Sequence, residues 1–140
     1  SDGRYKDILY VDGGVSSTGS IGHVRMQGRD VFKHAVEKLA AARDEVLSIA
    51  ELTADDIDWL VPHQENLRII NAMQKKLNLA DEKVIKTVST HANTSAASIP
   101  LALAAGVEAV KIKPGHLLAL EAIGGGLSWG ACLVRFGRPG

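Results

Sequence analysis

Apolar side chains recur every three or four positions in three stretches of the chain, which is the pattern of helices with one buried face. This spacing predicts helices over residues 30–50, 66–79 and 95–110. Asp30 is expected to cap the first helix, and Thr94 or Ser95 the third, because these residue types are common at helix N-caps. A shorter capped helical turn is expected at Thr53–Asp56.

Shorter apolar or alternating runs between these helices predict strands. We expect strands over residues 21–26, 58–61, 84–88, 116–122 and 127–136. The second strand stops at Pro62, which cannot donate to a strand ladder. The last two strands are separated only by Gly124-Gly125-Gly126, so they are expected to form an antiparallel hairpin.

The predicted order of elements is β-α-β-α-β-α-β-β. Strands that alternate with helices indicate an α/β fold with a mostly parallel sheet covered by helices on both faces. We therefore predict a mixed five-stranded sheet whose last strand is antiparallel. Residues 1–19 are polar and rich in Gly, so they are expected to be an irregular lead-in segment, and residues 20–140 a single domain.

The composition excludes several classes of protein. The charges balance, with 16 Lys and Arg against 16 Asp and Glu, so nucleic acid is not an expected partner. A single cysteine, Cys132, excludes an intrachain disulfide framework; it lies in an apolar run and is expected to be a buried small hydrophobe. No apolar stretch approaches the roughly 20 residues of a membrane span. The polar start at Ser1 does not resemble a signal peptide and is not Met, which we interpret as a cytoplasmic fragment or processed chain.

Two short polar stretches follow predicted strands and are the candidates for chemistry. His63 comes two residues after one strand, and Asn93 lies between another strand and a helix. Ligands of open α/β sheets bind beyond the carboxyl ends of the strands, so N–H groups of both side chains can converge there on a developing oxyanion. From spacing alone two structural alternatives stay open: His63 as a turn histidine and Asn93 as a helix cap.

Three motifs give the chain a more specific resemblance. They are Val61-Pro62-His63-Gln64-x-Asn66-x-Arg68-Ile69-Ile70, His91-x-Asn93-Thr94-Ser95-Ala96-Ala97-Ser98 and Glu121-Ala122-x-Gly124-Gly125-Gly126-x-x-Trp129-Gly130. In this order and spacing they resemble the β-ketoacyl-acyl-carrier-protein synthase III family of thiolase-like condensing enzymes. The resemblance runs from about Ile21 to Phe136 and implies that the chain is the carboxy-terminal half of such an acyltransferase.

The resemblance implies an activity in fatty-acid biosynthesis. Members of the family condense an acyl-CoA primer, here expected to be acetyl-CoA, with malonyl-acyl carrier protein by decarboxylative Claisen condensation, without a further cofactor. It implies that His63 and Asn93 stabilise the enolate oxygen, while the nucleophilic cysteine lies on an amino-terminal half absent from this chain. The residues implied for the pantetheine and acyl site are Gly28, Phe32, Asn66, Gly124, Gly125 and Gly126. Arg68 is implied to meet acyl carrier protein.

The family resemblance also implies partners and leaves one alternative. A full-length protein is expected to be a homodimer, and this half alone is expected to be inactive in condensation because it lacks the nucleophile. The alternative is an isolated domain that acts only in assembly or binding. Glu65, Arg29 and Ile123 depart from the usual family residues, and Ile123 precedes the Gly run where Phe is common.

Other chemistries fit the sequence poorly. Gly126-Leu127-Ser128-Trp129-Gly130 has the spacing of a nucleophile elbow, but a strand rather than a helix is expected after Ser128. The Gly run joins two strands and therefore lacks the helix N-terminus of a dinucleotide site. His91 is expected to be structural. The remaining histidines have no zinc-motif spacing, so no metal site is expected.

Overall fold

The structure is a computed structural model and describes residues 1–137. The strands are β1 (Leu9–Val11), β2 (Val24–Met26), β3 (Trp59–Pro62), β4 (Leu117–Gly124) and β5 (Ser128–Arg135). The α-helices are α1 (Gly28–Ile49), α2 (Leu67–Leu77), α3 (Val88–His91) and α4 (Ser98–Glu108). Short 3-10 helices occupy Gly3–Ile8, Ala54–Asp56, Asp81–Lys83 and Ser95–Ala97.

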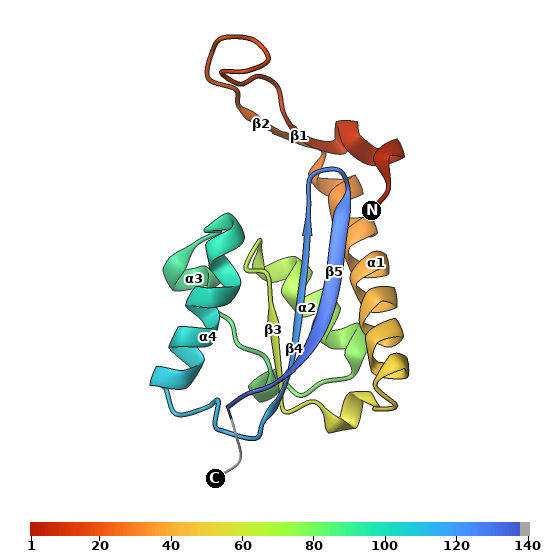
Figure 1. Ribbon diagram of the computed structural model, residues 1–140, viewed down its shortest axis with the longest axis vertical. Coiled ribbons are helices and arrows are strands. Elements are labelled where there is room, and N and C mark those ends of the chain that lie inside the picture. Colours follow the sequence, from red (N-terminus) through yellow and green to blue (C-terminus); the bar gives the residue numbers. More distant parts are fainter. Residues whose placement is uncertain (138–140) are drawn as a thin grey trace.

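A mixed sheet in the order β3-β4-β5 forms the centre of the fold. β3 is parallel to β4, with Leu60 opposite Ala119, and β5 is antiparallel to β4, with Cys132 opposite Leu120. Helices α1 and α2 pack on one face of this sheet and α4 on the other (Figure 1). The predicted α/β class, the mixed sheet with helices on both faces and the antiparallel last strand are therefore confirmed.

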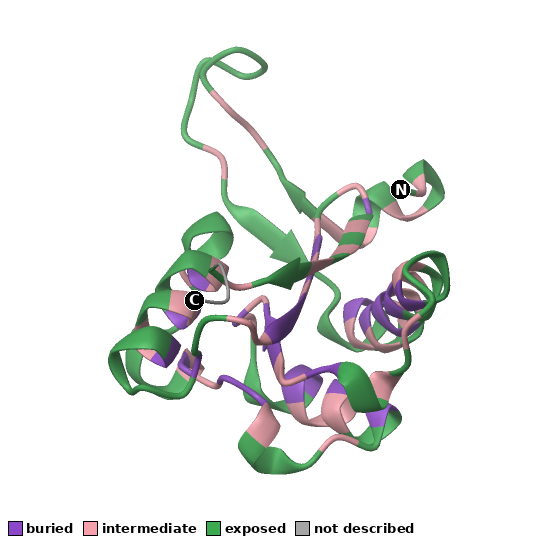
Figure 2. Cartoon of the chain, turned by 60° about the horizontal axis from the view of Figure 1, so that its bottom comes forward, coloured by how far each residue is buried: buried purple, intermediate pink, exposed green. Residues whose placement is uncertain are grey.

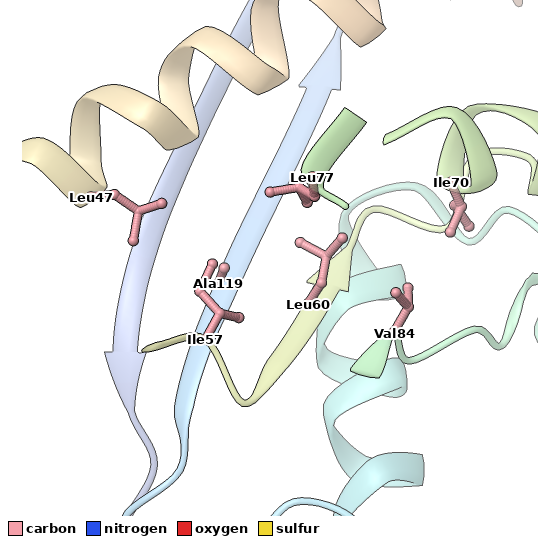
Figure 3. Close-up of a cluster of buried hydrophobic side chains, with 7 residues drawn as sticks. All are labelled: Leu47, Ile57, Leu60, Ile70, Leu77, Val84 and Ala119. Carbon is pink, nitrogen blue, oxygen red and sulfur yellow. The ribbon is translucent and has the colours of Figure 1, made fainter. Parts of the chain in front are cut away.

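The core divides along the alternation of side chains in the strands. Leu60 of β3 points into a cluster between the sheet and helices α1 and α2 (Figure 3). Its neighbour Val61 points to the opposite face, where it packs with Ala102 of α4 and Leu118 of β4. The clusters on both faces of the sheet are apolar, which explains why the sequence of β3 is a continuous run of hydrophobic residues.

The prediction of five strands in one sheet was wrong. The expected strand at residues 84–88 contributes only a single bridge, between Val84 and Leu60. The Gln64 side chain instead accepts the N–H groups of Thr87 and Val88, so the chain leaves the sheet there and turns into α3. The expected strand at residues 21–26 is β2, which pairs with β1 in a separate ribbon.

The segment at residues 1–19 is not wholly irregular, because it contains a 3-10 helix and β1. The ribbon of β1 and β2 extends away from the sheet, and most of its residues are exposed (Figure 2). The division of the chain at residue 20 stays a prediction, and the last three residues of the predicted domain 20–140 lie outside the described part.

Two predicted helix caps were wrong and one was right. Helix α1 begins at Gly28, so Asp30 lies in its first turn rather than at its cap. Helix α4 begins at Ser98, after a 3-10 turn, and neither Thr94 nor Ser95 caps it. Thr53 does begin a capped turn, since its backbone N–H and its hydroxyl both donate to the Asp56 carboxylate.

Cys132 is exposed, contrary to its predicted burial. It lies on the same face of the sheet as Leu120, its partner in the ladder. Helix α4 covers this face over β3 and the start of β4 but leaves Cys132 and Val134 of β5 open, and Val134 is 38% exposed. An apolar strip of β5 is therefore uncovered in this chain. Across residues 1–137, every helix is too short or too polar to cross a bilayer.

Candidate functional site

His63 stands directly after β3 and is held by the sheet on one side and by α4 on the other. Its backbone N–H donates to the carbonyl oxygen of Glu121 in β4, at 2.8 Å. Its ring Nδ1 lies 2.5 Å from the hydroxyl oxygen of Ser98, the first residue of α4. Burial lowers the pKa of His63 below its ordinary value of 6.5, which favours a neutral imidazole at neutral pH.

The Gln64 side chain fixes the turn that carries His63. Gln64 is fully buried, and its amide NH₂ donates to the carbonyl oxygens of Pro62 and Ile85. Its carbonyl oxygen accepts the N–H groups of Thr87 and Val88. These four bonds satisfy the whole amide and tie the turn after β3 to the next segment of chain.

Asn93 lies on a loop with an unusual backbone. Its carboxamide oxygen accepts the N–H of Ser95 at 2.9 Å, which leaves the amide NH₂ as the group available to a ligand. Ala92 has φ 58° and ψ −167°, and Ser95 has φ 54°, so both flanking residues adopt conformations that glycine tolerates best. This bond closes a local turn and is not a helix cap, since the 3-10 helix begins after Thr94 and α4 begins after Ala97.

A hollow of about 400 Å³ collects three distant segments of the chain around His63. Ser95 and Ala96 border it on one side, two and three residues after Asn93. The remaining lining residues come from the end of β4 and the start of β5: Ala122, Ile123, Gly124, Ser128, Trp129 and Gly130. Asn93 itself is exposed and is not part of this lining.

The three glycines of the β4–β5 turn differ in their surroundings. Gly124 borders the hollow with His63. Gly125 instead approaches the backbone of Leu9, because a Cβ added there would lie 2.9 Å from the Leu9 carbonyl oxygen. Gly126 has φ 137° and does not border the hollow. Only Gly124 therefore matches the predicted place of these glycines beside the site.

A second hollow, of about 680 Å³, brings together four residues that the resemblance implied for the pantetheine arm or for acyl carrier protein. Gly28, Phe32, Asn66 and Arg68 line it together with Arg29 and Leu67. The Arg68 guanidinium lies 6.0 Å from the centre of the Phe32 ring. Asn66 also caps α2, since its side-chain oxygen accepts the Ile69 N–H at 3.0 Å.

Two carboxyl groups lie near His63: the half-buried Glu65, two residues further along the chain, and the buried Glu121, opposite Pro62 in the sheet. Burial raises the pKa of Glu65 to about 7, and it also raises that of Glu121 to about 7 against the opposing effect of Arg43. In the described part of the chain, the Glu121 carboxyl oxygens have no hydrogen-bond partner. No cluster of three or more His, Cys, Asp or Glu side chains suited to a metal ion occurs among residues 1–137.

The family of 3-oxoacyl-[acyl-carrier-protein (ACP)] synthase III C-terminal regions matches residues 47–136. The chain belongs to this family. It is 60% identical over 136 residues to the β-ketoacyl-[acyl-carrier-protein] synthase III of Paracoccus denitrificans (strain Pd 1222), covering 97% of the chain and 42% of that protein. The synthase III chain thus spans well under half the length of the curated relatives it matches.

Solved structures confirm the thiolase-like fold of this synthase III chain. The 3-oxoacyl-[acyl-carrier-protein] synthase III of Aquifex aeolicus VF5 superposes with a TM-score of 0.88 at 40% identity, over 97% of this chain and 42% of that one. The enzyme of Pseudomonas aeruginosa PAO1 gives a TM-score of 0.90 at 36% identity, over 99% of this chain and 42% of that one. The resemblance found in the sequence is confirmed, whereas the roles of the site residues stay predictions.

Sequence reasoning missed two residues of the site. Gln64 and Ser98 both occur in the motifs but were given no role. Ser98 forms a hydrogen bond with the ring of His63, and the Gln64 side chain holds the turn that carries His63. The only signal in the sequence was that each is a polar residue inside a motif that adjoins an apolar segment. Its meaning depends on contacts between residues more than twenty positions apart.

Proposed function

We propose that this chain forms the carboxy-terminal part of the active site of a β-ketoacyl-acyl-carrier-protein synthase III. The complete enzyme condenses an acyl-CoA primer, with acetyl-CoA the expected one, with malonyl-acyl carrier protein and thereby starts fatty-acid synthesis. The observation that carries this proposal is the hollow shared by His63, the loop after Asn93 and the β4–β5 turn. Each of the three motifs of the resemblance contributes residues to that one hollow.

His63 and Asn93 act as hydrogen-bond donors in the decarboxylation step. A neutral imidazole N–H and the Asn93 amide N–H donate to the carbonyl oxygen of the malonyl thioester. The bond between the α-carbon and the carboxylate breaks, carbon dioxide leaves, and the electron pair moves onto the thioester as an enolate. The two donors stabilise the negative charge that grows on the oxygen, which is where preorganised N–H groups lower a barrier most.

The acyl group that the enolate attacks is held outside this chain. The α-carbon of the enolate bonds to the carbonyl carbon of an acyl-cysteine, and the cysteine thiolate leaves. Cys132 does not fit this role, because it lies on β5 and does not line the hollow around His63. The nucleophilic cysteine is therefore assigned to the amino-terminal half, and this chain alone is expected not to condense substrates.

The second hollow is assigned to the pantetheine arm and its carrier. Gly28, Phe32 and Asn66 line it from α1 and the start of α2. Of the turn Gly124, Gly125 and Gly126, Gly124 borders the first hollow, which is assigned to the acyl group. Arg68 is exposed at the second hollow, where its guanidinium is available to an acidic protein surface. We assign acyl carrier protein as the partner at this place.

The uncovered strip of β5 supports a partner half. Cys132 and Val134 present apolar surface on a sheet face that α4 covers only in part. The matched relatives contain more than twice the length of this chain, so an amino-terminal half is available to cover the strip. The complete enzyme is expected to be a homodimer of such two-part chains.

The test is to co-express this chain with the amino-terminal half of a related synthase III and to measure condensation of acetyl-CoA with malonyl-acyl carrier protein. Activity is expected in the complex and is expected to fall about 100-fold or more in His63→Ala and Asn93→Ala. His91→Ala is the matched control, because His91 is exposed, lies two residues from Asn93 and has no catalytic role in this scheme. A stable complex without condensation would favour the alternative of a domain that acts only in assembly or binding.

A further inference from the structure

Among residues 1–137, the only side-chain hydrogen bond of the His63 ring is with the hydroxyl of Ser98. The oxygen lies 2.5 Å from Nδ1 and also accepts the backbone N–H of Gln64 at 3.2 Å. Ser98 is 2% exposed, so its hydroxyl is shielded from water. Its hydrogen bonds must therefore be satisfied by these two neighbours.

The balance of donors and acceptors selects one arrangement of protons. A hydroxyl donates one hydrogen bond and accepts up to two. The Gln64 N–H already occupies one acceptor position on Ser98. If His63 carried its proton on Nδ1, Ser98 would accept twice and its own O–H would have no acceptor in the described part of the chain, which is costly for a buried group. If Ser98 donates to Nδ1 instead, every group is satisfied.

The surrounding bonds hold this arrangement in place. Gln64, whose N–H meets Ser98, is fixed through both ends of its own buried amide. His63 is fixed by its backbone bond to Glu121, so its ring and the Ser98 hydroxyl approach from two rigid elements, the end of β3 and the start of α4. The geometry is therefore set by the fold rather than by side-chain freedom.

We propose that Ser98 is a positioning residue that fixes the neutral ring of His63 in the tautomer with its proton on Nε2. The proton is then on the nitrogen remote from Ser98, where it can donate to the malonyl thioester oxygen. The other tautomer would direct a lone pair at the growing negative charge. This inference rests on the proposed role of His63 as an oxyanion donor and names the residue that makes a donor of it.

The direct test is nitrogen NMR of the co-expressed complex labelled with ¹⁵N-histidine. The His63 signals are identified as those lost in His63→Gln. We expect one nitrogen with the shift of a protonated Nε2 and one with the shift of an unprotonated Nδ1 that accepts a hydrogen bond. A protonated Nδ1 in the wild type would overturn the proposal, whatever the activity of the enzyme.

A kinetic series adds a second readout. Ser98→Ala is expected to lower kcat for decarboxylation of malonyl-acyl carrier protein by about 10- to 100-fold with little change in KM. Ser98→Thr keeps the hydroxyl and is expected to restore most of that loss. Equal losses in both variants, with the wild-type tautomer retained in Ser98→Ala, would assign Ser98 a packing role and refute the proposal. Full activity of His63→Ala would refute the proposed function separately, since the tautomer of the wild type is measured without reference to activity.

Discussion

The backbone N–H of His63 donates to the carbonyl oxygen of Glu121, at 2.8 Å, and this bond belongs to the last pair of the parallel ladder of β3 and β4, Pro62 with Glu121. The imidazole is thus carried by the last rung of a sheet, although His63 itself follows Pro62 and lies outside the strand. Asn93, in contrast, is carried by a loop. The position of His63 therefore depends on the sheet, whereas that of Asn93 depends on the backbone conformation of its loop.

Asn93→Asp tests the donor assigned to Asn93. A carboxylate keeps the acceptor for the Ser95 N–H, so the loop should keep its conformation. It removes the amide donor and adds negative charge beside the enolate, so kcat should fall by about 1000-fold in the co-expressed complex. Asn71→Asp is the control, because Asn71 accepts a bond from Lys86 and lines neither hollow, so this variant is expected to keep full activity. An active Asn93→Asp would exclude the donor role.

Ala92→Gly tests the backbone conformation of the same loop. At φ 58° and ψ −167° a Cβ is unfavourable, so removing it should stabilise the protein by about 1 kcal/mol. The matched control is Ala41→Gly, at an exposed position inside helix α1, where the same change should destabilise by about 0.5–1 kcal/mol. Urea denaturation of the two variants measures both values. Destabilisation of equal size at both positions would contradict the strained geometry at Ala92.

Glu65→Gln tests a half-buried carboxyl group. Burial raises the pKa of Glu65 from 4.5 to about 7, so the folded chain binds a proton more tightly than the unfolded chain. Its contribution to stability is then complete below about pH 4.5 and is lost as the pH rises to about 7. Glu65→Gln should match the wild type near pH 4.5 and exceed it by about 1–2 kcal/mol near pH 8.

The pH dependence of that difference is the quantity to measure, by urea denaturation across this range. Glu82→Gln, at an exposed position of a short 3-10 helix, is the control. It should show no such growth in stability between the two conditions. A constant difference for Glu65→Gln at all pH values would indicate a packing effect instead.

Arg68→Ala tests the assigned contact with acyl carrier protein. Loss of an exposed guanidinium beside the second hollow should raise KM for malonyl-acyl carrier protein about tenfold and leave kcat nearly unchanged. The difference from the wild type should shrink at high salt, because screening weakens contacts between exposed charges. Lys75→Ala, an exposed cation in the last turn of the same helix, is the control. An equal effect of both substitutions would indicate general charge rather than a specific contact.

Cys132 serves as a probe of the uncovered strip. Its exposed thiol should react readily with a maleimide in this chain alone. In the complex with an amino-terminal half, the strip should be covered and labelling should slow by about tenfold or more. Equal labelling rates with and without the partner, in a complex shown to be stable, would place the interface elsewhere.

The sequence by itself determined the family and most of the helices and strands. Helical spacing located α1 and α2, and the Gly run between apolar segments located the hairpin of β4 and β5. These features are local, because they depend on the period of apolar residues and on turn chemistry. The resemblance implied Gly28, Phe32 and Asn66 for the pantetheine arm and Arg68 for acyl carrier protein. The structure gathers these four around one hollow.

Tertiary structure decided what local pattern left open. Residues 84–88 have a strand-like sequence, yet the buried Gln64 amide takes the backbone N–H groups of Thr87 and Val88 and so keeps most of the segment out of the sheet. Cys132 lies in an apolar run but is exposed, because burial depends on what covers a sheet face and not on the strand alone. The pairing of His63 with Ser98, 35 residues further on, likewise arises only when β3 and α4 come together. The spacing of hydrophobic residues determines whether a segment forms a helix or a strand and which of its faces is buried. Hydrogen bonds between groups far apart in the sequence determine where that segment ends and which side chains come into contact.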